Sequence, residues 1–207
     1  TFKWYTELFS DGSIMESLYT TIIVAVIASI ISTVIGTISA ISIHNMSPRR
    51  KAILTNLSYI PMVNPDIVIG ISLLSFFSIL NLKLGYITLI LAHITFNIPY
   101  VIFAVLPKLQ QLNPNIEEAA LDLGATPIQA FFKVILPEIM PGIITGSLLA
   151  FTLSLDDFIV SFFTTGSGVS TLSIKVYSMT KRGISPKINA LSSLMFIAVL
   201  ALMLLLQ

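Results

Sequence analysis

The hydrophobic residues of this chain fall into five long runs that are separated by short polar segments. A helix needs about 20 apolar residues to cross a hydrocarbon layer of about 30 Å. The five runs reach or approach that length, which predicts an all-α domain over residues 1–207, built as a bundle of membrane-spanning helices. The predicted spans cover residues 17–43, 52–80, 85–106, 142–163 and 190–206.

The first predicted span is uncharged and carries a stripe of small residues. Ser32, Gly36 and Ala40 recur at every fourth position, so they share one face of a helix. Small side chains allow the backbones of neighbouring membrane helices to approach closely. The stripe therefore predicts that this helix packs tightly against another helix of the bundle.

The second predicted span is interrupted, because it contains two prolines and an aspartate that a regular membrane helix would not carry together. Asn64, Pro65 and Asp66 match the N-cap, N1 and N2 positions of a new helix. Asparagine is a favoured cap, proline is tolerated at N1, and a carboxylate is stabilised at the positive end of a helix. A helix that begins at membrane depth is expected only where protein or a water-filled path surrounds it.

The composition agrees with a membrane protein and narrows its chemistry. Hydrophobic residues make up 55% of the chain and charged residues 10%, whereas soluble domains carry about 25% charged residues. The net charge of +1 excludes the strongly basic surface that nucleic acids require. The chain has no cysteine and no glycine-rich phosphate loop. We therefore predict no metal site and no cofactor, and we predict that any ATP hydrolysis belongs to a partner protein.

The polar loop of residues 107–141 predicts two short helices joined by a corner. Asn113 or Asn115 can cap the first helix, and Gly124 can supply the left-handed residue that ends it. The second helix, over residues 126–135, is predicted to have one apolar face that lies against the bundle or the membrane surface. Two helices joined in this way form a stiff projection, which could transmit movement from a soluble partner. The residues predicted for the apolar face are Ile128, Phe131, Phe132 and Ile135.

The same loop resembles a known motif. The cytoplasmic EAA loop of binding-protein-dependent ATP-binding-cassette (ABC) importer permeases is similar to the sequence Glu118-Ala-Ala, three residues, Gly124, nine residues and Val134-Ile-Leu-Pro137. These permeases usually have isoleucine where Val134 stands. The resemblance implies that the loop lies in the cytoplasm and docks into a cleft of the ATPase. The basic cluster Arg49 to Lys51 favours the same side of the membrane. The implied coupling residues are Glu117, Glu118, Ala119, Ala120, Asp122, Gly124 and Pro137.

A finer resemblance extends over nearly the whole chain. The second permease subunit of spermidine/putrescine importers is similar in Asn64-Pro-Asp-Ile-Val, Ala92-His-Ile-Thr-Phe, Phe151-Thr-Leu-Ser-Leu-Asp-Asp, Ile174-Lys-Val-Tyr-Ser-Met and Ile184-Ser-Pro. This implies the type I ABC importer permease fold, with a sixth, N-terminal span missing here. It also implies a bacterial inner membrane location, a second permease subunit in a pseudo-symmetric heterodimer, an ABC ATPase dimer and an external polyamine-binding receptor.

Carboxylates inside the predicted spans are candidates for a cation path. An acidic residue costs roughly 2.5 to 3.5 kcal/mol at the centre of a membrane helix, so its presence points to function. Polyamines are flexible polycations, which carboxylates and aromatic faces attract. Asp66, Asp156 and Asp157 are predicted to lie near one level, with Phe158 and Phe162 as stacking partners.

Each of these carboxylates also has a structural alternative. Asp66 can serve only to cap a buried half-helix. Asp156 and Asp157 are neighbours on a helix and must point differently, so at most one is expected to face the path. The other is expected to pair with Lys175, Arg182 or the partner permease.

Polar side chains elsewhere in the spans are expected to stabilise the bundle. His93 and Asn97 share one helix face, and we predict interhelical hydrogen bonds there, with a metal or proton role as the alternative. Tyr177 is expected to anchor the chain at the membrane interface.

Other functions are distinguished by what they would require. An importer for another solute, such as iron, an amino acid or an oxyanion, would share the loop, although an acidic path argues against oxyanions. Inverted repeats would favour a secondary transporter, but the sequence does not show such repeats. A membrane enzyme that uses Asp156 and Asp157 as an acid pair would need further active-site residues on another span, where only Asp66 is available.

Overall fold

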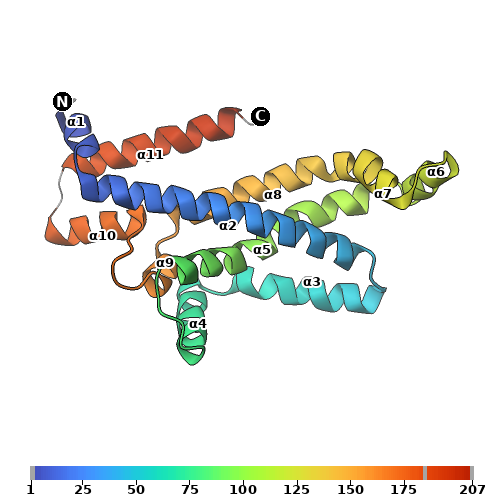
Figure 1. The fold of residues 1–207 in the computed structure, drawn as a ribbon, viewed down its shortest axis with the longest axis horizontal. Coiled ribbons are helices and arrows are strands. Elements are labelled where there is room, and N and C mark those ends of the chain that lie inside the picture. Colours follow the sequence, from blue (N-terminus) through green and yellow to red (C-terminus); the bar gives the residue numbers. More distant parts are fainter. Residues whose placement is uncertain (1–2, 184–185, 206–207) are drawn as a thin grey trace.

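The protein is an elongated bundle of helices in the computed structural model, which describes residues 3–183 and 186–205. Three long helices lie side by side in its middle, namely α2 (Gly12–His44), α5 (Tyr86–Gln111) and α8 (Leu136–Asp156). Figure 1 shows them running along the length of the molecule. The remaining elements are α1 (Lys3–Phe9), α3 (Pro48–Val63), α4 (Asp66–Ile79), α6 (Ile116–Asp122), α7 (Pro127–Ala130), the π-helical turn η1 (Phe131–Ile135), α9 (Ile159–Thr164), α10 (Leu172–Arg182) and α11 (Pro186–Leu205).

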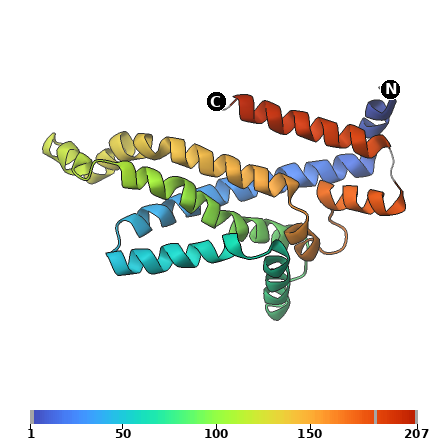
Figure 2. The ribbon, with the colours of Figure 1, turned by 180° about the vertical axis from the view of Figure 1, so that it is seen from behind.

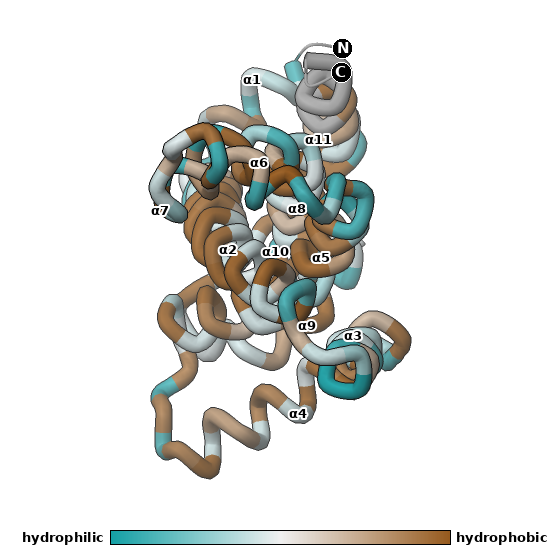
Figure 3. Tube along the Cα trace, turned by 90° about the vertical axis from the view of Figure 1, so that its right-hand side faces the viewer, coloured by the Kyte–Doolittle hydropathy of each residue, from teal (hydrophilic) through white to brown (hydrophobic). Residues whose placement is uncertain are grey.

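The outer surface of the bundle is apolar, as a lipid environment requires. Tyr19, Ile30 and Ile38 on α2 are exposed, although they are large hydrophobic residues. The tubes of α2, α4 and α5 are predominantly hydrophobic in Figure 3, whereas hydrophilic residues gather at the start of α3. Among the described residues, α2, α5 and the continuous stretch Pro127–Asp156 are long and apolar enough to cross a membrane, and α3 and α4 together form a bent fourth candidate. The chain is therefore a multi-pass membrane protein.

The small-residue stripe of α2 forms the contact with α5. Ser32, Gly36 and Ala40 are all buried, and Ala40 packs in a core with Val101 and Val105. A Cβ atom on Gly36 would lie 2.6 Å from the Cβ of Val101, which is closer than van der Waals contact permits. The predicted close approach of two helices is confirmed, and glycine is required at its tightest point.

We expect the substitution Gly36→Leu to destabilise the bundle by roughly 1–3 kcal/mol, because a side chain there forces α2 away from α5. The thermal unfolding midpoint of the detergent-solubilised protein measures this effect. Gly12→Leu is the matched control, since a Cβ atom on Gly12 meets no other atom within 4 Å. Equal midpoints for the two variants would contradict the packing argument.

The second predicted span is two helices with an angle of 104° between them. Its interruption was predicted, but α4 begins at Asp66 with Pro65 as its N-cap, while Asn64 is the C-cap of α3. Pro61 lies inside α3. Figures 1 and 2 both show α4 projecting across the long axis of the bundle. The segment 52–80 is thus no straight span.

The fourth predicted span, 142–163, also differs from the structure. Its helix starts earlier, at Leu136, and ends at Asp156. Asp157 has non-helical backbone angles, and the short helix α9 begins two residues later. The first predicted span lies within α2, which is longer at both ends. The third corresponds to α5, which begins one residue later than predicted and continues five residues further. The fifth lies in α11, and residue 206 at its end is outside the described residues.

Candidate functional site

The three intramembrane carboxylates meet at one cavity, which we call the carboxylate pocket. Asp66, Asp156, Asp157 and Phe158 line it, and its volume is about 240 Å³. It lies where the break between α3 and α4 meets the break between α8 and α9. Its lining is completed by Phe96, Leu153 and Ile159.

Close packing of α4 on α9 brings the two breaks together. A Cβ atom on Gly70 of α4 would lie 2.8 Å from the ring of Phe163 on α9. In both Figure 1 and Figure 2, α9 lies beside the start of α4. Segments that are about 90 residues apart in the sequence therefore form a single site.

Asp156 and Asp157 occupy different environments, as expected for neighbours that point differently. Asp156 is exposed, whereas the side chain of Asp157 is only 7% exposed. The carboxylate of Asp157 accepts hydrogen bonds from the backbone N–H of Val160 at 3.2 Å and of Ser161 at 2.7 Å. Asp157 thus satisfies the first backbone donors of α9.

Within the described residues, Asp157 lies beside His93 and not beside Lys175. Its side chain lies 3.6 Å from Nε2 of His93, and no ion pair with Lys175 forms within the described part of the chain. The side chain of Arg182 lies outside the described residues. A carboxylate inside the bundle is satisfied by the nearest helix end and a buried histidine, without a distant lysine.

Asp66 occupies both positions that the sequence left open, the start of a helix and the wall of the cavity. It is the first residue of α4, where a carboxylate is stabilised by the positive end of the helix. It is also exposed and lines the carboxylate pocket. A place at the helix end and a place at the cavity are therefore compatible.

Aromatic rings extend from the carboxylate pocket toward α10. The ring centroid of Phe158, which lines the pocket, lies 5.6 Å from that of Phe162 and 4.7 Å from that of Tyr177. Phe162 is exposed and is not part of the pocket lining. The ammonium group of Lys181 lies 4.8 Å above the ring of Tyr177, a distance that suits a cation–π interaction. Tyr177 thus contacts Phe158 and Lys181 although it is 41% exposed, and Phe96 and Phe158 are the rings that line the pocket.

His93 and Asn97 form interhelical hydrogen bonds, as predicted. Nε2 of His93 lies 3.0 Å from Oγ of Ser161 on α9, and the Asn97 amide donates to Oγ of Ser154 on α8 at 2.8 Å. All four side chains are buried. Sequence reasoning missed the two serines, which carried no signal beyond being small polar residues in an apolar run.

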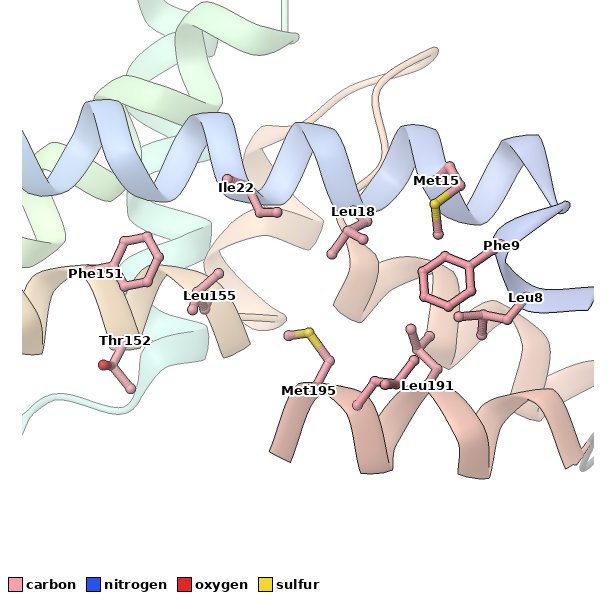
Figure 4. Close-up of a pocket in the computed structure, with 11 residues that line it drawn as sticks. Leu8, Phe9, Met15, Leu18, Ile22, Phe151, Thr152, Leu155, Leu191 and Met195 are labelled. Carbon is pink, nitrogen blue, oxygen red and sulfur yellow. The ribbon is translucent and has the colours of Figure 1, made fainter. Parts of the chain in front are cut away.

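A second cavity, shown in Figure 4, has different chemistry. Its volume is about 390 Å³, and it lies between α1, the start of α2, the carboxyl end of α8 and α11. Thr152 is the only polar residue among those that line it. A cavity without charge offers no attraction to a cation, so the smaller carboxylate pocket is the candidate site despite its size.

The loop at the opposite end of the molecule has the predicted helix–corner–helix form. Gly124 has a left-handed φ of +87°, and its N–H donates to the carbonyl of Leu121 at 2.9 Å. Thr126 caps α7 by accepting from the N–H of Gln129, while the Gln129 side chain accepts from the N–H of Thr126. Figure 1 shows α6 and α7 projecting beyond the ends of the long helices.

The structure adds two details to this loop. Ala120 is buried within the loop itself, so only Ala119 offers a small exposed side chain. Asn115 is the N-cap of α6 but makes no cap with its side chain. Asn113 instead accepts a hydrogen bond from the N–H of Asn115 at 3.0 Å.

The second helix of the loop does not have the single predicted apolar face. It becomes the π-helical turn η1, in which the N–H of Leu136 bonds to the carbonyl of Phe131, and this inserts one extra residue per turn. Phe131 and Ile135 line a cavity of about 320 Å³ beside the ends of α2 and α5. Ile128 and Phe132 point outward and are 72% and 60% exposed.

The fold and the site together define a polytopic membrane permease: a bundle of apolar helices, two helix breaks around carboxylates, and a rigid two-helix projection at one end. The family described as "Binding-protein-dependent transport system inner membrane component" matches residues 32–207. This chain belongs to that family.

Several relatives are similar over most of their length. The chain is 35% identical, over all of its residues and 80% of the relative, to the spermidine/putrescine transport system permease protein PotC of Haemophilus influenzae. It is 37% identical to PotC of Escherichia coli K12, covering 95% of this chain and 75% of that protein. The putrescine transport system permease protein PotI of the same strain is 40% identical, covering 95% of this chain and 73% of that protein.

A solved structure confirms the expected fold. The crystal structure of an amino acid ABC transporter with histidines superposes with a TM-score of 0.73 at 17% identity, covering 98% of this chain and 95% of that one. The all-helical bundle is thus the type I ABC permease fold.

Proposed function

We propose that this chain is one of two permease subunits of an ABC importer for polyamines, spermidine or putrescine, and that both subunits together form the translocation path. The observation that carries the proposal is the carboxylate pocket, where Asp66, Asp156 and Asp157 meet beside Phe158 at two helix breaks. The relatives that are named as spermidine/putrescine and putrescine permeases support the same substrate class.

The chemistry of the pocket suits a flexible polycation. At an effective dielectric constant of about 20, unit charges 4 Å apart attract by about 4 kcal/mol. The exposed carboxylates of Asp66 and Asp156 would meet successive ammonium groups, and the ring of Phe158 would contact the methylene chain between them. An oxyanion would be repelled by the same groups.

The energy for transport is proposed to come from a separate ABC ATPase dimer that docks on α6 and α7. Glu117, Glu118 and Asp122 are exposed on α6. Around the Gly124 corner, Leu123 and Ile128 are exposed apolar side chains that a partner surface would cover. Pro137, at the start of α8, joins this projection to the bundle. An external receptor would deliver the polyamine on the other side of a bacterial inner membrane.

Uptake by the complete importer in proteoliposomes tests this function. We expect ATP-dependent accumulation of radiolabelled spermidine or putrescine when this chain, its second permease, the ATPase dimer and the receptor are all present. Omitting this chain should abolish uptake. Accumulation of ferric iron or an amino acid in place of polyamines would overturn the substrate assignment, and accumulation without ATP would overturn the ABC mechanism.

A further inference from the structure

His93 on α5 directs its polar contacts to the start of α9. The side chain is 1% exposed, and its Nε2 atom lies 3.0 Å from Oγ of Ser161 and 3.6 Å from Oδ2 of Asp157. Its other ring nitrogen, Nδ1, is buried without a hydrogen-bond partner among the described residues. Burying an imidazole costs desolvation free energy. Because the polar contacts of His93 lie at the start of α9, we expect the histidine to act there.

Asp157 is engaged by the same helix end. Its two carboxylate oxygens accept from consecutive backbone donors, Val160 and Ser161. Ser161 therefore bonds to Asp157 through its backbone and to His93 through its side chain. These contacts form a closed connection between α5 and the first turn of α9.

The connection has a consequence for the neighbouring carboxylate. Asp156 is the last residue of α8 and directly precedes Asp157, so the conformation of the break determines the direction of its side chain. The backbone carbonyl of Asp156 accepts from Oγ of Ser173 at 3.3 Å, which fixes the other side of the break. The Asp156 carboxyl itself is exposed.

We propose that His93 is a positioning residue for transport: through Ser161 and Asp157 it holds the start of α9 against α5, and so directs the Asp156 carboxylate into the pocket. Asp157 then acts as the acceptor for the first backbone N–H groups of α9, and its charge is not required to bind the substrate. The transport part of this inference rests on the proposed function, whereas the structural part does not.

Asparagine substitutions separate the two neighbouring aspartates. Asparagine caps a helix about as well as aspartate, whereas alanine costs about 0.5–2 kcal/mol at a cap. In the complete importer we expect Asp157→Asn to lower polyamine uptake by only about two- to threefold, because asparagine keeps one of the two oxygens that accept from α9. Asp157→Ala should lower uptake by about tenfold, as should Asp156→Asn. Equal losses in Asp157→Asn and Asp156→Asn would overturn the assignment, because both residues would then act by charge.

Thiol labelling tests the role of His93 without reference to polyamines. The chain has no cysteine, so Val160→Cys introduces its single thiol at a fully buried position in α9. In the assembled importer we expect a methanethiosulfonate reagent to label this thiol slowly. Adding His93→Leu should increase the labelling rate about tenfold, whereas His93→Gln, which keeps a hydrogen-bonding group, should restore slow labelling.

Thr20→Val is the matched control for the loss of a buried interhelical hydrogen bond. The Thr20 hydroxyl lies 2.9 Å from the Tyr86 hydroxyl between α2 and α5, and it takes no part in the contacts of α9. This variant should leave the labelling rate unchanged. Slow labelling in His93→Leu, or an equal increase in Thr20→Val, would overturn the inference. Faster labelling in His93→Leu alone, with no polyamine uptake by the wild type, would overturn only the proposed function.

Discussion

Replacing both Asp66 and Asp156 with asparagine is expected to lower polyamine uptake at least about tenfold, while the importer still assembles. The two exposed carboxylates of the pocket would lose their charge and keep their size. A tenfold change in uptake corresponds to about 1.4 kcal/mol. The attraction between one pair of unit charges 4 Å apart is about 4 kcal/mol at a dielectric constant of about 20, so the loss of the charges is large enough to produce this change. Initial rates of radiolabelled spermidine and putrescine uptake measure the effect, and affinity purification of the complex measures assembly.

Asp11→Asn provides the control for this double substitution. Asp11 caps α2 and accepts from the N–H and hydroxyl of Ser13, so asparagine can replace it as a cap. It lies outside the carboxylate pocket, and its substitution should leave uptake unchanged. Normal uptake kinetics in the Asp66 and Asp156 double variant would remove both residues from the path.

The substitution Gly124→Val is expected to leave the chain inserted but to separate ATP hydrolysis from uptake. A Cβ atom on Gly124 would meet no other atom within 4 Å, so the strain arises only from its left-handed φ of +87°. That conformation costs about 1–2 kcal/mol for an L-residue, or about tenfold in the population of the native corner. In proteoliposomes that contain the complete importer, we expect ATP hydrolysis to continue while uptake falls by about this factor.

Two further variants identify the cause of the uncoupling. Gly124→Asn should be milder, because asparagine tolerates the left-handed region better than valine. Gly12→Val should have no effect on coupling, since Gly12 also has open space around it but no left-handed φ. If Gly124→Val transports normally, the corner does not transmit movement in the proposed way.

The parts of the structure that could be predicted depend on signals close together in the sequence. Gly124 and Thr126 specify the corner and the following cap through their own backbone preferences. The spacing of Ser32, Gly36 and Ala40 specifies the buried face of α2. In each case the residues that produce the feature lie within about two helical turns.

The features that could not be predicted depend on distant or competing contacts. The run 142–163 is apolar enough for one helix, but Asp157 ends it because its carboxylate is satisfied by α9 and by His93, which is 64 residues away. Hydrophobic periodicity predicts an unbroken second helix in the loop, whereas packing of Phe131 and Ile135 beside α2 and α5 accompanies a π-helical turn. Periodicity does not register such a change of pitch.

The same turn η1 sets the rotational phase of the projection relative to the bundle. Each residue of a regular α-helix advances by about 100° and each residue of a π-helical turn by less. If the same residues Phe131–Ile135 wound at the regular pitch, the tip would therefore swing by roughly a quarter of a revolution. The pitch of this short turn therefore determines which side of α6 would face a docking partner.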